Sequence, residues 1–176
     1  MIQSNRMRYL LVAIVWLIVD FVTKRVVLTN QEALREGIIL IDGFLQFTYV
    51  RNAGAAFGMF QGGRWPFVAV SSLATVGLLW TILRGHSTGL RAYAYALILA
   101  GAAGNLVDRI FYEGRVVDFI LMSWHEKGFP VYNVADMGVS IGAAFLILTM
   151  LRERDPRDPS AEENVEQPGP SSVSTD

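Results

Sequence analysis

Four long apolar runs dominate the chain and predict four membrane-spanning helices, over residues 9–28, 65–83, 92–111 and 134–151. A helix needs about 20 predominantly apolar residues to cross the hydrocarbon core of a bilayer, and each run is close to that length. Gly138 and Gly142, in the fourth run, have the spacing of small residues that lets membrane helices pack closely. We therefore expect a membrane protein with an all-α core.

The first run differs from the others because Asp20, Lys24 and Arg25 interrupt it. Arg6 and Arg8 in front of an apolar run are also typical of a cleaved secretory signal, but no Ala-x-Ala cleavage site follows here. We interpret the first run as an uncleaved membrane anchor.

The connection between the first two helices, residues 24–64, contains two β-prone runs at 38–41 and 44–50. Asp42 and Gly43 lie between these runs, and Asp-Gly is a strong signal for a two-residue hairpin turn. We expect a small sheet on the membrane surface.

The connection between the last two helices, residues 108–133, is expected to be irregular. Glycine and proline disfavour regular structure, and this connection contains Gly114, Gly128 and Pro130. We expect it to form a loop or a short helix that folds over the helix ends and covers the site.

Composition supports a membrane protein, since 52% of the residues are hydrophobic and only 18% are charged. A net charge of −1 gives no basic field that would attract nucleic acid. The absence of cysteine excludes disulfides and a cysteine nucleophile, and two histidines make a multi-histidine metal site improbable. Residues 155–176 are rich in Pro, Glu, Ser and Asp, which predicts a disordered tail after a folded domain over 1–154.

The distribution of Lys and Arg predicts the orientation in the membrane. Basic residues are dense at the N-terminus, in the turn 84–91 and over 152–157, and sparse in the two long connections. Positive residues resist translocation, so we expect both termini in the cytoplasm and both long connections on the periplasmic side.

Charged residues within the predicted helices need partners, because a charge inside a membrane is costly. Asp20 and Lys24 are four residues apart and share a helix face, so they either pair with each other or contact a substrate. Asn105 and Arg109 have the same spacing, with Asp108 beside them. This second group either anchors its helix at the interface, holds a lipid phosphate or supports a site.

Asp118 and Asp136 are expected at the same outer rim, because one follows the third helix and the other opens the fourth. Two carboxylates that share one proton can hydrolyse an amide. One deprotonates a water, and the other donates a proton to the carbonyl oxygen and later to the departing amine. The spacing alone does not distinguish this pair from a helix-capping aspartate and an unrelated surface aspartate.

Around these residues the sequence resembles lipoprotein signal peptidase, also called signal peptidase II. The resemblance extends from the first helix to the fourth, and five blocks occur in the family's order. The blocks are 20–24 (DFVTK), 52–58 (NAGAAFG), 101–109 (GAAGNLVDR), 116–119 (VVDF) and 129–136 (FPVYNVAD).

This resemblance implies that the protein cleaves prolipoproteins just before a cysteine that already carries a diacylglyceryl group. Asp118 and Asp136 match the family's two catalytic aspartates, and the small Gly54 would let an extended peptide approach the backbone. The resemblance also implies inhibition by the cyclic peptide globomycin. The residues implied to line or support the site are Asn52, Gly54, Asn105, Asp108, Arg109 and Asn133, with Asp20 and Lys24 nearby.

We further expect a monomer in the bacterial inner membrane that contacts membrane lipid and needs no metal or cofactor. Three other functions compete with this hypothesis. A transporter or channel would need polar residues along a path through the bundle, whereas Asp20, Asp118 and Asp136 lie towards one face. A presenilin-like protease would need a Gly-x-Gly-Asp motif, which the sequence lacks. A purely structural subunit would leave the outer acid and amide residues without a role.

Overall fold

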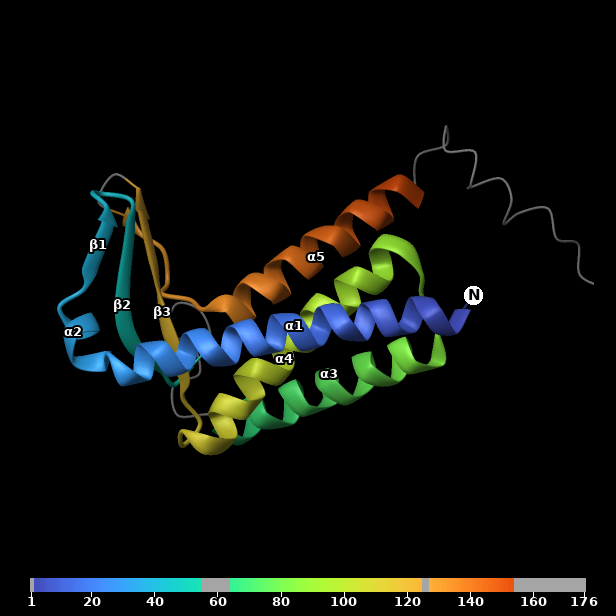
Figure 1. Ribbon diagram of the computed structural model, residues 1–176, viewed down its shortest axis with the longest axis horizontal. Helices are drawn as coiled ribbons and strands as arrows, with labels where there is room; N and C mark the ends of the chain where they lie inside the picture. Colours follow the sequence, from blue (N-terminus) through green and yellow to red (C-terminus); the bar gives the residue numbers. More distant parts are fainter. Residues whose placement is uncertain (1, 55–63, 125–126, 154–176) are drawn as a thin grey trace, which may run out of the picture.

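The computed structural model describes residues 2–54, 64–124 and 127–153. In this part of the chain, four long helices lie together and a small sheet lies at one end of them (Figure 1). The helices are α1 (Ile2–Thr29), α2 (Gln31–Arg35), α3 (Arg64–Arg84), α4 (Gly89–Phe111) and α5 (Val134–Glu153). The strands are β1 (Ile38–Ile41), β2 (Leu45–Asn52), β3 (Val116–Trp124) and β4 (Lys127–Gly128).

Helix α4 lies at the centre of the bundle and packs against α1, α3 and α5. Its buried face is built from small residues such as Ala92, Ala96 and Ala100, which meet Tyr9 and Ile82 of the neighbouring helices. Small side chains allow helix backbones to approach closely, which is how helices associate where no water drives them together. The long helices therefore form one packed unit.

The glycines of α5 are positions of close helix contact, as their spacing predicted. A Cβ added to Gly138 would lie 2.5 Å from the indole nitrogen of Trp16. A Cβ added to Gly142 would lie 2.7 Å from the backbone oxygen of Ala94. A larger residue at either position would push α5 away from α1 or α4.

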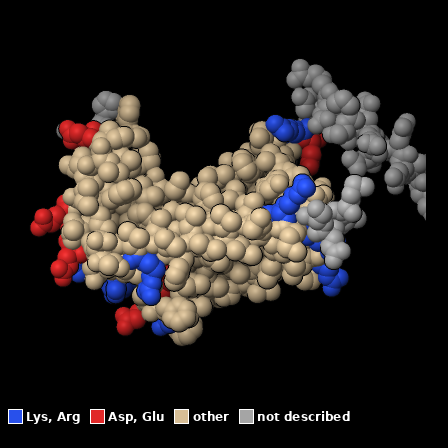
Figure 2. Space-filling model, viewed as in Figure 1, with Lys and Arg blue, Asp and Glu red and all other residues tan. Residues whose placement is uncertain are grey.

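The outer surface of the bundle is apolar. Side chains such as Ile14 on α1, Leu73 on α3 and Ile147 on α5 are more than half exposed. Figure 2 shows the charged side chains of this face at the two ends of the molecule, with a broad zone without charge between them. Such a surface suits a bilayer core, where apolar groups need no water.

Three helices in the described part of the chain, α3, α4 and α5, are long and apolar enough to cross a membrane. Helix α1 has 28 residues, but Asp20, Lys24 and Arg25 interrupt its apolar run. The sequence predicted four spans, and three of them are confirmed as helices of this kind in the described residues.

The first connection contains the predicted hairpin, formed by β1 and β2. Its turn differs from the prediction: Ile41 pairs with Leu45, so the loop has the three residues 42–44 rather than two. Gly43 adopts φ of +67°, a conformation that glycine reaches without strain. Short helix α2 also lies in this connection and packs against β2.

The second connection is not irregular as predicted, because residues 116–124 form strand β3 at the centre of the sheet. The strand order is β1-β2-β3-β4, all antiparallel. Val116, Val117, Asp118 and Phe119 of β3 are all buried, so the strand lacks the alternation that reveals a half-buried strand in a sequence. Gly114, Gly128 and Pro130, which suggested a loop, lie outside β3.

The sheet is held on the end of α1 by a second apolar cluster. Val27 and Leu34 meet Val117 and Phe119 of β3 there. This contact places the start of β3 beside the C-terminal ends of α1 and α4. The predicted tail at 155–176, and the stretch 55–58 of the second sequence block, lie outside the described residues.

Candidate active site

The carboxylate of Asp118 is buried at the start of β3, where the backbone pairs with Val50 of β2. Its Oδ1 accepts a hydrogen bond from Asn133 Nδ2 at 2.6 Å, and its Oδ2 accepts one from Asn52 Nδ2 at 2.9 Å. Burial, together with the nearby charge of Asp136, raises the pKa of Asp118 from 3.8 to about 7. Asp118 is therefore a carboxyl group that can hold a proton near neutral pH.

The carboxylate of Asp136 is fixed by the N-terminus of α5. Asn133 precedes the helix, and its Oδ1 accepts a hydrogen bond from the Asp136 backbone N–H at 3.0 Å. In return, Asp136 Oδ2 accepts one from the Asn133 backbone N–H at 3.2 Å. This reciprocal pattern is a capping box. Asp136 Oδ1 accepts a third hydrogen bond, from Asn105 Nδ2 at 2.7 Å.

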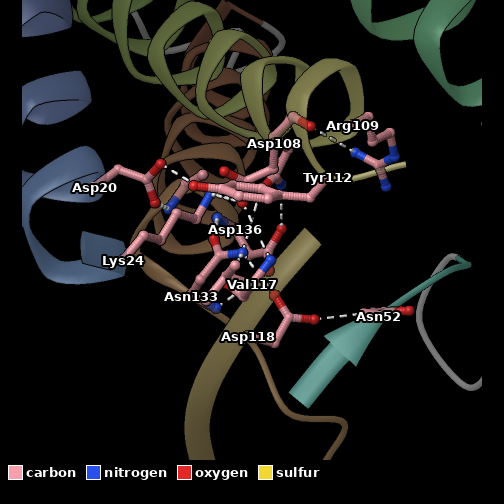
Figure 3. A network of polar contacts seen from close by, with 12 residues as sticks. Asp20, Lys24, Asn52, Asp108, Arg109, Tyr112, Val117, Asp118, Asn133 and Asp136 are labelled. Carbon is pink, nitrogen blue, oxygen red and sulfur yellow. Dashed lines mark hydrogen bonds and ion pairs between the residues drawn. The ribbon is translucent and has the colours of Figure 1, made fainter. Parts of the chain in front are cut away.

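Asn133 connects the two carboxylates and has no exposed surface. Its side-chain nitrogen donates to the Asp118 carboxylate. Its side-chain oxygen accepts from the Asp136 backbone N–H, and its own backbone N–H donates to the Asp136 carboxylate. The same nitrogen lies 3.1 Å from Asn105 Oδ1. Figure 3 shows Asn133 and Asp136 between Lys24 on one side and Asn52 on the other. Each of the four carboxylate oxygens of Asp118 and Asp136 accepts one N–H, so both groups are oriented by amides.

The ammonium group of Lys24 is the second centre of this network. It lies 2.9 Å from a carboxylate oxygen of Asp20 and 2.9 Å from one of Asp108, and it donates to Asn105 Oδ1 at 3.1 Å. These contacts use all three of its donors. With Asn105 Oδ1 accepting from Lys24 and Asn133, the amide nitrogen of Asn105 is left to face Asp136.

Both partners of Lys24 also bind backbone N–H groups of the site. Asp20 Oδ1 accepts from Ala135 N at 2.8 Å, at the start of α5, and Asp108 Oδ2 accepts from Val117 N at 3.1 Å, beside Asp118. Gly104 makes room for this arrangement, because a Cβ there would lie 2.5 Å from Asp20 Oδ2. Asp20 and Lys24 thus support the elements that carry the two aspartates.

Arg109 extends from the last turn of α4 and is also buried. Its guanidinium lies over the ring of Phe67 on α3, 4.9 Å from the ring centre. Its Nη1 donates to the backbone oxygen of Asn105 at 3.3 Å, while its Nε has no hydrogen-bond partner in the described structure. A buried guanidinium with a spare donor is suited to hold an oxygen of a ligand.

The two aspartates face a cavity of about 470 Å³. Asn52, Gly54, Asn105 and Arg109 also line it, and Gly54 N donates to Asn52 Oδ1 at 3.0 Å. Residues 130–132 of the second connection contribute to the wall. The remaining wall is largely apolar, with Val70 and Ala74 of α3, Ile98 and Ala102 of α4, and Val139 of α5.

The structure thus brings together all the residues predicted from the sequence. Two contributors were missed. Trp16 on α1 donates from Nε1 to Val134 O at 2.9 Å and so helps to hold the start of α5. Trp16 lies four residues before Asp20, on the same helix face, and this spacing could have indicated it. Phe67, whose ring lies beneath Arg109, could not be recognised from the sequence, because it is one apolar residue among many in the run 65–83.

Comparisons with known proteins identify the family of this chain. The profile of the family described as Signal peptidase (SPase) II matches residues 12–152. The chain belongs to the signal peptidase II family. A lipoprotein signal peptidase of Symbiobacterium thermophilum is 46% identical over 143 residues, which cover 81% of this chain and 93% of that protein. One from Halalkalibacterium halodurans is 39% identical over 160 residues, covering 90% of this chain and 100% of that protein.

A solved structure described as a bacterial membrane enzyme has the same fold. It superposes with a TM-score of 0.77 at 30% sequence identity, and the match covers 85% of this chain and 91% of that one. Together with the three apolar helices, family membership makes this chain a membrane peptidase.

Proposed function

We propose that the protein removes the signal peptide from diacylglyceryl-modified prolipoproteins, by cleavage just before the lipidated cysteine. Asp118 and Asp136 activate the water that attacks the peptide bond. The observation that carries this proposal is the pair of carboxylates joined by one buried amide, Asn133, at the wall of a mostly apolar cavity. The relatives named lipoprotein signal peptidase support the choice of substrate.

The two carboxyl groups take different parts in the reaction. Asp118 carries the proton, because burial raises its pKa to about 7. Asp136 takes a proton from the water, and the resulting hydroxide attacks the scissile carbonyl carbon. Asp118 gives its proton to the carbonyl oxygen. The tetrahedral intermediate then collapses: the C–N bond breaks, the amine leaves with the proton that Asp136 received, and Asp118 takes back a proton from a hydroxyl of the intermediate, which becomes the new carboxyl group. Water is the only co-reactant, and no metal or cofactor takes part.

Other residues of the cavity position the substrate. Arg109 presents its spare donor to a backbone oxygen of the signal peptide, and Gly54 leaves room for an extended chain. The apolar walls from α3, α4 and α5 receive apolar side chains. Membrane lipid surrounds the bundle, and the enzyme acts as a monomer.

The protein spans the bacterial inner membrane four times, with α1 as the fourth span. Both termini are cytoplasmic and the site lies at the periplasmic ends of the helices. Two observations support α1 as a span: it lies beside α4 along the bundle, and the ammonium of Lys24 is neutralised internally by Asp20 and Asp108. A charge that is paired inside the protein is tolerated in a membrane.

Cleavage of a purified lipidated prolipoprotein tests the proposal. Asp118→Asn and Asp136→Asn should each abolish cleavage without preventing membrane insertion, because asparagine keeps size and polarity but cannot transfer the proton. The double variant should lose little more than either single one, since the pair acts as a unit. Asp20→Asn, which preserves an acceptor for Ala135, should lose activity only in part. Near wild-type cleavage by either dyad variant would refute the mechanism.

A further inference from the structure

A second cavity lies outside the active site, between α1 and α4. It has a volume of about 400 Å³. Phe21, Val107 and Phe111 supply its apolar walls, and its polar lining residues are Lys24, Arg25, Asp108 and Tyr112. Neither Arg25 nor Tyr112 has a part in the proposed reaction. The residues of α4 that line this cavity differ from Ile98, Ala102, Asn105 and Arg109, which line the catalytic one.

Two guanidinium groups converge on the ring of Tyr112. Arg25 donates from Nη1 to the Tyr112 hydroxyl at 3.3 Å. The guanidinium carbon of Arg51, on β2, lies 5.9 Å from the centre of the same ring, and Arg51 Nε donates to the hydroxyl of Tyr49 at 2.7 Å. Both arginine side chains are exposed. Figure 2 shows basic side chains gathered where the bundle meets the sheet.

No carboxylate of the described residues forms an ion pair with Arg25 or Arg51. Glu113, the residue after Tyr112, is exposed and makes no such pair. Lys24 and Asp108, at the inner side of the cavity, are already paired with each other. Among the described residues, two positive groups thus lie around one ring with no carboxylate paired to either, although like charges repel. An anion from outside the chain would neutralise them.

The apolar walls of the cavity, beside Arg25, show which anion fits. Phe21 is 53% exposed and Phe111 is 73% exposed, so the cavity is open along an apolar surface. A small inorganic anion has no apolar part that could pack against that surface. A phospholipid has both parts, a phosphate for the guanidinium groups and acyl chains for the phenyl rings.

We infer that the groove between α1 and α4 binds a membrane phospholipid, with the headgroup phosphate at Arg25 and Arg51 and an acyl chain along Phe21 and Phe111. This inference rests on the membrane placement given under Proposed function, but not on the chemistry of the two aspartates. The phosphate accepts hydrogen bonds from both guanidinium groups and from the Tyr112 hydroxyl. The bound lipid fills the outer seam between α1 and α4.

Native mass spectrometry of the full-length protein in detergent tests this site with three probes. They are phosphatidylglycerol, a diacylglycerol with the same chains, and glycerol 3-phosphate without chains. The wild type should bind phosphatidylglycerol at least about tenfold more tightly than either of the others. The variant Arg25→Gln/Arg51→Gln should bind it roughly thirtyfold more weakly, the effect expected of two basic residues near an anionic lipid.

Matched variants separate the site from overall charge. Arg35→Gln/Arg84→Gln removes two exposed arginines elsewhere and should bind phosphatidylglycerol within about twofold of the wild type. Arg25→Lys/Arg51→Lys keeps both charges and should retain most of the affinity. Unchanged binding in Arg25→Gln/Arg51→Gln would overturn the inference. Equal binding of diacylglycerol would show only an apolar groove, and equal binding of glycerol 3-phosphate only an anion site; either result would also overturn it.

Prolipoprotein cleavage in the same detergent provides the control for folding. Arg25→Gln/Arg51→Gln should cleave within about twofold of the wild type, because neither side chain reaches the two aspartates. Absence of cleavage in the wild type would refute the proposed function while leaving the lipid measurements valid. The two ideas therefore fail separately.

Discussion

Replacing Asp118 by asparagine is expected to change the stability of the protein in opposite directions at low and high pH. Burial raises the pKa of Asp118 from 3.8 to about 7 in the folded protein. Between these two values the folded state keeps a proton that the unfolded state has released. The free energy of unfolding of the wild type therefore falls as pH rises through this window. Asparagine does not ionise, so the variant escapes this loss.

The size of the effect follows from the two pKa values. They differ by about 3 pH units, from 3.8 to about 7, and each unit corresponds to about 1.4 kcal/mol. The stability of Asp118→Asn relative to the wild type should thus rise by about 4 kcal/mol between pH 4 and pH 8. A constant cost opposes it, because the new amide nitrogen must face a donor, either Asn52 or Asn133. Leaving one buried donor unpaired costs about 1–3 kcal/mol at any pH. The variant should be less stable than the wild type at pH 4 and more stable at pH 8.

Unfolding by SDS in mixed micelles, followed by tryptophan fluorescence at half-unit steps of pH, measures this difference. Asp118→Leu provides a matched second variant. It also cannot ionise, so it should show the same rise with pH from a lower starting stability. A difference between Asp118→Asn and the wild type that stays constant within about 1 kcal/mol from pH 4 to pH 8 would refute the argument that burial holds a proton on Asp118.

Three further results are expected. Lys24→Met should lower the free energy of unfolding by about 3–5 kcal/mol, because it leaves the buried carboxylates of Asp20 and Asp108 unpaired. Neutralising both carboxylates in the same protein should restore most of the lost stability. SDS unfolding measures both changes. Gly104→Ala should reduce prolipoprotein cleavage at least tenfold, since its Cβ would displace the Asp20 carboxylate, whereas Gly77→Ala, where a Cβ meets nothing within 4 Å, should not. A cysteine at Gln46 should react with an impermeant reagent from the periplasmic side and one at Ser87 should not, and the reverse pattern would contradict the orientation.

The helices were predictable from the sequence because each one is a long, continuous hydrophobic run. Such a run can be recognised without knowing any tertiary contact. The hairpin was predictable because Asp42-Gly43 marks its turn. Strand β3 was not, since its first four residues are buried together and show no alternation. Its pairing with β2 joins residues more than 60 positions apart, such as Asn52 and Val116, and no local pattern indicates such a partner.

The polar residues of the site could be identified one by one. Placing a polar or charged side chain among apolar segments costs free energy, so each such residue needed an explanation. Their connections could be predicted only in part. Asp20 and Lys24 do pair, as their helical spacing indicated. The other partners of Lys24, Asp108 and Asn105, are on a helix about 80 residues further along, so only the packing of α1 against α4 reveals them. The capping box of Asn133 and Asp136 is local, and a helix-capping aspartate was one alternative for this pair, but the part of Asn133 in the cap was not predicted.

The contact between Asp20 and the start of α5 joins residues 115 positions apart in the chain. During synthesis α1 is made long before Ala135. Lys24 can pair with Asp108 only after α4 has been made. Until then Asp20 and Lys24 have only each other, and their spacing of four residues lets them neutralise one another inside the nascent helix. Of the described helices, α5 is made last, and it carries Asp136 and completes the network. Under the proposed mechanism, a chain that stops before α5 therefore lacks Asp136 and holds only one of the two carboxyl groups that activate the water.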